Sequence, residues 1–154
     1  MMETYFYFRT QATIANDDDI AQSAMFPVSS FMGCYPTADT TLKVHFKSLI
    51  IQNVAATRVI QNDTDLASAS IMVKQPHDLL TDHVLLTITA NKHREVMEAI
   101  ANATINRNSS RPFVVVADDL STATEYLHAN ITACSTITVN TAAAGSDSFS
   151  STFS

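Results

Sequence analysis

The stretch that decides the fold is VLLTITANKHREVMEAIANATINRNSSRPFVVV, residues 84–116. Residues 84–89 form a short run rich in leucine and β-branched side chains, and residues 113–116 form a continuous apolar run; both patterns are typical of strands. The polar residues 108–110 break the chain just before the second run. Because a helical pattern lies between the two runs, we expect strand, helix and strand to form the centre of the fold.

The helix is predicted from the spacing of the side chains between these strands. Asn91 is a residue type that caps helix N-termini, so the helix is expected to run from about Lys92 to Asn106. Charged side chains lie mostly off the apolar stripe, which is typical of an amphipathic helix packed on a sheet rather than of a cofactor-binding element. The stripe consists of Val96, Met97, Ile100 and Thr104.

Further strands are predicted by alternation along the rest of the chain. Residues 41–47 alternate most regularly, which directs Leu42, Val44 and Phe46 inward and leaves Lys43, His45 and Lys47 in water. Residues 3–13 and 135–139 show the same period, and in the first of these the tyrosines and phenylalanines occupy opposite faces that both need cover. We therefore expect an α+β, β-rich single domain over residues 1–139, with an antiparallel or mixed sheet or a sandwich and one principal helix.

Composition excludes several classes of function. The chain has 154 residues, 46% of them hydrophobic, which suits one core, and its only glycines are Gly33 and Gly145, so it lacks a Gly-rich loop for a phosphate. Its net charge of −6 with scattered lysines and arginines argues against direct binding of nucleic acid. The first residues lack the pattern of a signal peptide and no run is long enough to span a membrane, so we expect a soluble protein.

The carboxylates and histidines do not form a convincing catalytic or metal site. Asp118 and Asp119 near His128 are the most tempting group, but adjacent carboxylates on a strand point to opposite faces and also suit turns. The acidic run 16–19 lacks the spacing and the glycine of a calcium loop. His77, His83 and His93 form no metal-binding pair on a helix. We expect no enzyme activity, no cofactor and no metal.

The two cysteines, Cys34 and Cys134, lie far apart in sequence and match no metal or redox spacing. The simplest interpretation is two buried thiols, and a disulfide stays open if the fold brings them together.

Two segments are candidates for contacts with other subunits. Residues 24–36 are apolar but punctuated by Pro27, Gly33 and Pro36, which indicates either an extended arm or a loop that crosses the core. Residues 140–154 are rich in Ser, Thr and Ala and are expected to be a C-terminal tail or arm. The candidate contact residues are Phe26, Phe31, Met32, Tyr35, Phe149 and Phe153.

Several segments also carry a resemblance to a known group of proteins. FPVSSFMG (26–33), TTLKVHF (40–46) and NKHREVMEAI (91–100), followed by FVVVADD (113–119) and residues 126–139, resemble small virion proteins of marine tailed phages, including phages of picocyanobacteria. The resemblance covers roughly residues 25–139 and rests on the order of short segments rather than on a chemical motif.

The resemblance implies a structural protein of the particle, a head decoration or cement protein that binds and stabilises the shell. Its partners would then be the major capsid protein and copies of itself, and its place the capsid exterior after synthesis in the host cytoplasm. Such proteins have no catalytic residues to carry over. A tail, neck or fibre component, a small binding module made in the infected cell and an unrecognised enzyme are the alternatives.

Overall fold

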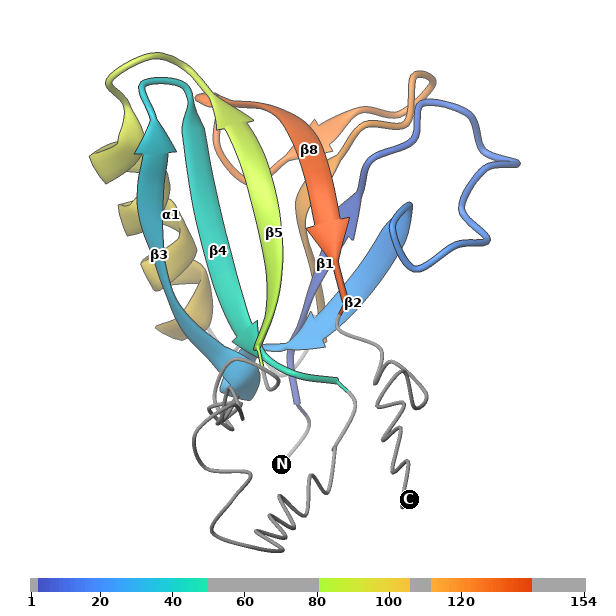
Figure 1. Cartoon of the computed structure of the whole chain (residues 1–154), viewed down its shortest axis with the longest axis horizontal. Helices are drawn as coiled ribbons and strands as arrows, with labels where there is room; N and C mark the ends of the chain where they lie inside the picture. The colour runs from blue at the N-terminus through green and yellow to red at the C-terminus, as the bar shows by residue number, and fades with distance from the viewer. Residues whose placement is uncertain (1–2, 50–80, 106–111, 140–154) are drawn as a thin grey trace, which may run out of the picture.

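Two four-stranded sheets enclose an apolar core in the computed structural model, which describes residues 3–49, 81–105 and 112–139 (Figure 1). Sheet A has the order β2-β1-β6-β7 and sheet B the order β3-β4-β5-β8. The elements of sheet A are β1 (Tyr5–Arg9), β2 (Ser23–Pro27), β6 (Phe113–Asp118) and β7 (Glu125–Tyr126). Those of sheet B are β3 (Phe31–Ala38), β4 (Thr41–Lys47), β5 (Thr81–Ile88) and β8 (Ile131–Thr138), and the helices are η1 (Val28–Ser30) and α1 (His93–Ile105).

The pairing is mixed, because β1 and β6 run parallel while the other neighbouring strands run antiparallel. β5 and β6, the two strands that flank α1 in sequence, hold interior positions in different sheets. The predicted α+β fold, rich in strands and with one principal helix, is therefore confirmed.

Phenylalanines from both sheets meet in the core. Phe6 and Phe8 of β1 are fully buried, and Phe26 of β2 stacks on Phe46 of β4 with ring centroids 4.4 Å apart and an interplanar angle of 6°. The alternation of β4 is as predicted, since Leu42 and Val44 are also buried while the intervening side chains face outward. The two sheets are thus joined largely by aromatic side chains, each of which contributes a large apolar surface.

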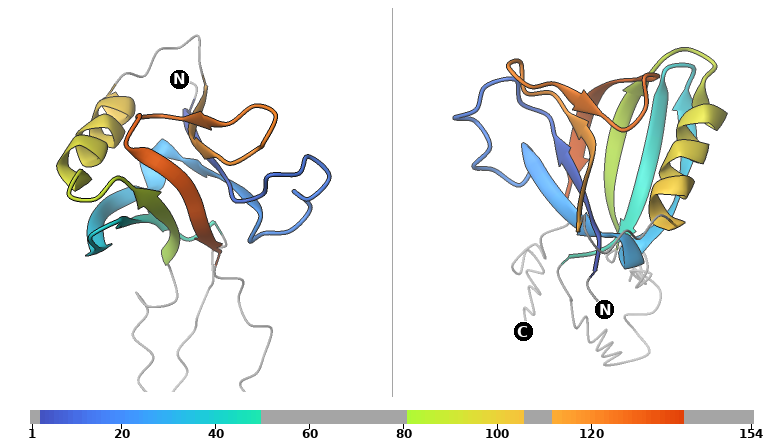
Figure 2. Two further views of the ribbon diagram at one scale, coloured as in Figure 1. Left: turned by 90° about the horizontal axis from the view of Figure 1, so that it is seen from above. Right: turned by 180° about the vertical axis from the view of Figure 1, so that it is seen from behind.

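Helix α1 lies on the same side of sheet B as sheet A does (Figures 1 and 2). Val96 and Ile100 of the predicted stripe are buried, and the helix ends observed are within about a residue of those expected. Within the residues given above, no helix is long and apolar enough to cross a membrane.

The predicted cap of this helix is wrong. Asn91 has φ +61°, in the left-handed region that asparagine tolerates, and its N–H donates to the carbonyl of Asp39. The helix start is instead tied to the β3–β4 turn by the His93 ring, whose Nε2 lies 2.9 Å from the carbonyl oxygen of Ala38. Asn91 therefore forms the turn before the helix and does not cap the helix N-terminus.

Residues 24–36 are built into both sheets rather than forming a projecting arm. They form β2, then η1 as the passage between the sheets, and then most of β3. Pro27 and Pro36 fit because β2 and β3 are edge strands, where a missing backbone donor is tolerated. Gly33 fits because its φ of +137° lies in a region that other residues rarely adopt.

Candidate assembly faces

The structure separates the predicted contact residues into buried and accessible ones. Phe26 has no exposed surface, because its pairing with Phe6 on β1 turns its ring into the core, so its ring is not offered to a partner. Phe31 is half-buried, with its ring centroid 6.0 Å from that of Phe46. Met32 and Tyr35 are 56% and 48% exposed. Phe149 and Phe153 lie outside the described residues.

Tyr35 belongs to a row of aromatic rings on the outer surface of sheet B. Its ring stacks on His45 of β4 with centroids 5.3 Å apart, and its hydroxyl lies 3.1 Å from the Nε2 of His45. His45 in turn lies opposite His83 of β5, with centroids 5.6 Å apart. Gly33 is the direct β3 partner of His45 and leaves open space there, so Tyr35 can lie diagonally across it.

We call this surface the histidine face and define it by Tyr35, Lys43, His45, Lys47, His83 and Leu85. Threonines of β4, β5 and β8 surround these residues. The outward-facing residues of the sheet B strands β3, β4, β5 and β8 include no Asp or Glu, although the whole chain has a net charge of −6.

The two histidines of this face are held largely neutral at pH 7. Partial burial lowers the pKa of His45 and of His83, and the positive charge of Lys43 lowers both further. The neighbouring His45 ring also lowers the pKa of His83, whereas the Asp82 carboxylate raises it by a smaller amount. At neutral pH the face therefore presents two lysine charges and uncharged aromatic rings.

A second outward surface, on sheet A, is apolar. Tyr7 pairs with Met25 on one side and with Val115 on the other, and its ring lies 5.0 Å from that of Phe113. Met25 is 44% exposed and Phe113 47%. We call this surface the tyrosine face and define it by Tyr5, Tyr7, Met25, Pro27, Phe113 and Val115, which share one side of β1, β2 and β6. The structure thus brings together side chains whose need for cover the alternation in β1 had already indicated.

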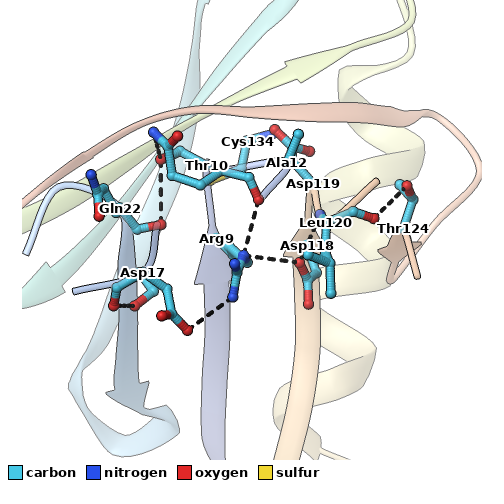
Figure 3. Close-up of polar contacts among 12 residues, drawn as sticks. Arg9, Thr10, Ala12, Asp17, Gln22, Asp118, Asp119, Leu120, Thr124 and Cys134 are labelled. Atoms are coloured by element: carbon cyan, nitrogen blue, oxygen red, sulfur yellow. Dashed lines mark hydrogen bonds and ion pairs between the residues drawn. The ribbon is translucent and has the colours of Figure 1, made fainter. Parts of the chain in front are cut away.

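The carboxylates considered for catalysis make contacts within the fold (Figure 3). Asp119 accepts the hydroxyl of Tyr126 at 2.7 Å and the backbone N–H of Cys134 at 3.0 Å, which links β6, β7 and β8. Asp118 accepts the backbone N–H of Leu120 and lies 4.0 Å from the Nε of Arg9. The two side chains therefore bind different partners, as expected for neighbours on a strand.

The pKa values of two groups in contact with Asp119 are raised. Burial raises the pKa of the Cys134 thiol to about 12, and the negative charge of Asp119 adds to the effect. Burial also raises the pKa of the Tyr126 hydroxyl, which the hydrogen bond to Asp119 raises further. His128 accepts the N–H of Asn130 at its Nδ1, so it also has a local structural contact.

A buried arginine fixes the loop between β1 and β2, which projects from the domain in Figures 1 and 2. Arg9 donates from Nε to the carbonyl of Gln11, from Nη2 to that of Thr13 and from Nη1 to Asp17, at 2.7–2.9 Å. These contacts explain why the strand predicted over residues 3–13 ends at Arg9. They also give one residue of the acidic run 16–19 a role in the loop, because Asp17 pairs with Arg9.

Within the part of the chain that the structure describes, no three His, Cys, Asp or Glu side chains gather in a way that could hold a metal ion. Cys34 and Cys134 are free and lie on the two edge strands of sheet B. Three strand spacings separate those edges, about 14 Å, whereas a disulfide needs Cα atoms within about 7 Å. An intramolecular disulfide is therefore excluded by the fold.

Comparison with known proteins gives no relative: no family model, no curated protein and no solved structure matches this chain.

Proposed function

We propose that this chain is a structural protein of a tailed-phage particle, a capsid decoration or cement protein that binds the outer surface of the head shell through its histidine face. The observation that carries the proposal is the row Tyr35, His45 and His83 on the outward surface of the four-stranded sheet B. The phage itself comes from the resemblance in sequence. What supports binding is the chemistry of the face, since tyrosine rings combine a rigid apolar area with a polar tip.

The size of the face suits a protein that works in many copies. Four strands about 4.8 Å apart and seven residues long cover about 460 Å², whereas a stable protein interface buries about 800 Å² on each partner. A single copy is therefore expected to bind weakly through this face alone. Copies linked to each other on a symmetric shell would bind far more tightly, because the second contact of a linked pair forms at high effective concentration.

The charge of the face gives it an orientation. Lys43 and Lys47 are its only charged side chains at neutral pH apart from the small protonated fraction of its histidines, while acidic residues such as Asp18 and Asp19 lie elsewhere on the chain. A shell surface that carries carboxylates would attract this side and repel the others. Such rim charges act mainly on the rate of association and make it sensitive to salt.

The test is binding to shells of the major capsid protein assembled without this chain. We expect saturable, regular binding by the unsubstituted protein in a co-sedimentation assay. Tyr35→Ser should weaken it about tenfold or more, since aromatic anchors dominate such contacts. Ile14→Ser, which alters an exposed apolar side chain on the β1–β2 loop, is the matched control and should bind normally.

Two results would contradict the proposal. Failure of the unsubstituted protein to bind shells would favour the binding module of the infected cell, or a tail, neck or fibre component if the protein is found in purified particles. Binding that survives Tyr35→Ser, His83→Ser and Lys43→Glu together would show that another surface makes the contact.

A further inference from the structure

The tyrosine face is about half the size of the histidine face, which suits a short peptide. Three strands about 4.8 Å apart and five residues long cover about 240 Å², well under the 800 Å² that each side of a stable protein complex buries. One or two aromatic side chains, which bury about 150–250 Å² each, would cover it. The face therefore favours an occupant with a few closely spaced aromatic anchors.

The chain itself contains such a peptide. Residues 140–154, NTAAAGSDSFSSTFS, carry Phe149 and Phe153 four residues apart and a single charged side chain, Asp147. Small and polar residues fill the rest, so the two phenylalanines are the only large apolar groups in the segment. Their chemistry matches a surface made of tyrosine, methionine, proline and phenylalanine.

The point at which the segment leaves the domain also fits. In Figures 1 and 2, β8 ends toward the same end of the domain at which β1 begins. Tyr5 at the start of β1 is paired with both Pro27 and Phe113, so this end of the tyrosine face is the nearer one. Phe149 lies ten positions after Val139, which allows a reach of up to about 35 Å.

We propose that the tyrosine face binds residues 140–154 of this chain, with Phe149 and Phe153 as the anchors. The contact goes beyond the proposed role on a phage shell and does not depend on it. Every copy of the chain has both the tyrosine face and residues 140–154. The same contact made between two copies would therefore link neighbouring subunits.

The test uses the full-length chain with Phe149→Ser and Phe153→Ser, whose own segment has lost both anchors, and a fluorescent peptide of residues 140–154. Fluorescence anisotropy should show saturable binding. The unsubstituted chain should bind the same peptide more weakly, because its own segment competes for the face. A peptide with both serine substitutions should not bind.

Variants of the face supply the second arm. Added to the F149S/F153S chain, Phe113→Ser or Met25→Ser should weaken peptide binding about tenfold. Met32→Ser and Ile105→Ser, which remove exposed apolar side chains outside the face, should change it less than twofold. Circular dichroism checks the fold of each variant.

Nuclear magnetic resonance tests the same contact without any substitution in the tyrosine face. Peptide added to the F149S/F153S chain should shift amide signals of β1, β2 and β6. Absence of saturable binding at millimolar peptide, equal binding by the face variants, or shifts confined to sheet B would each overturn the proposal. None of these results depends on whether the protein binds shells.

Discussion

Phe26→Ala is the sharpest test of whether the segment 24–36 belongs to the core or serves as a contact arm. The Phe26 ring has no exposed surface and lies parallel to that of Phe46. It also meets Phe8 with centroids 6.0 Å apart, so its loss leaves a cavity between the two sheets. If the segment were instead an arm, the same substitution would alter assembly and leave stability nearly unchanged.

The expected loss is about 3–5 kcal/mol of unfolding free energy, the range for truncating a buried phenylalanine to alanine. Area gives a similar value, because 150–200 Å² of buried ring at about 25 cal/mol per Å² corresponds to about 4–5 kcal/mol. A domain of this kind has about 5–15 kcal/mol in total, so the loss is a large share of its stability. A double-mutant cycle with Phe46→Leu should show coupling of about 0.5–1.5 kcal/mol from the stacked pair.

Urea unfolding followed by far-ultraviolet circular dichroism measures the effect. With a slope of about 2 kcal/mol per molar urea, the midpoint should fall by about 1.5–2.5 M. Met32→Ala, in the same segment but 56% exposed, is the control and should change the free energy of unfolding by no more than about 0.5 kcal/mol. A loss below about 1 kcal/mol for Phe26→Ala, with an unchanged slope, would refute the core assignment and restore Phe26 as a contact residue.

Three further predictions concern stability. Gly33→Ala and Gly33→Ser should each cost about 1–3 kcal/mol in urea unfolding and by similar amounts, because the site has open space and the cost comes from its φ of +137°. Asp119→Ala should cost about 2–4 kcal/mol, since it leaves the Tyr126 hydroxyl and the Cys134 N–H without their charged acceptor, whereas Asp119→Asn should cost less. Because the pKa of His83 is lowered in the folded protein, the unfolded chain binds a proton at this residue more readily. The contribution of neutral His83 to stability is therefore present above about pH 6.5 and is lost as the pH falls. His83→Asn should accordingly reduce the fall in Tm between about pH 7.5 and about pH 5.

The sequence predicts best where one local rule determines the structure. Strict alternation places Leu42, Val44 and Phe46 inside because one face of β4 meets the core along its whole length. The apolar stripe of α1 also depends only on local spacing in the sequence, so the predictions of the helix and of its buried side were correct. Asn91 failed as a cap because the same residue type also suits a left-handed turn, and the turn geometry before the helix decided between them.

The contact faces depend on pairing between distant residues and could not be predicted from local patterns. Phe26 was predicted as a contact residue because Pro27 and Gly33 interrupt the alternation of apolar and polar residues around it. Only its pairing with β1 shows that the ring points inward. The approach of His45 to His83 likewise requires the register between β4 and β5, which are separated by residues 48–80. Arg9 ends β1 through contacts with a loop that no propensity scale describes.

Salt distinguishes the two proposed contacts, because the histidine face carries two lysine charges and the tyrosine face as defined carries none. Attraction through Lys43 and Lys47 on the exposed histidine face should weaken as the Debye length falls from about 10 Å at 0.1 M salt to about 3 Å at 1 M. Binding of Phe149 and Phe153 to the apolar tyrosine face should hold or strengthen, especially with sulfate, since that salt favours burial of apolar surface. From about 0.05 to about 1 M sodium chloride, the association rate of shell binding should therefore fall, whereas peptide binding should hold. If both weakened in parallel, the two contacts would share an electrostatic basis, and assigning them to faces of different chemistry would be wrong.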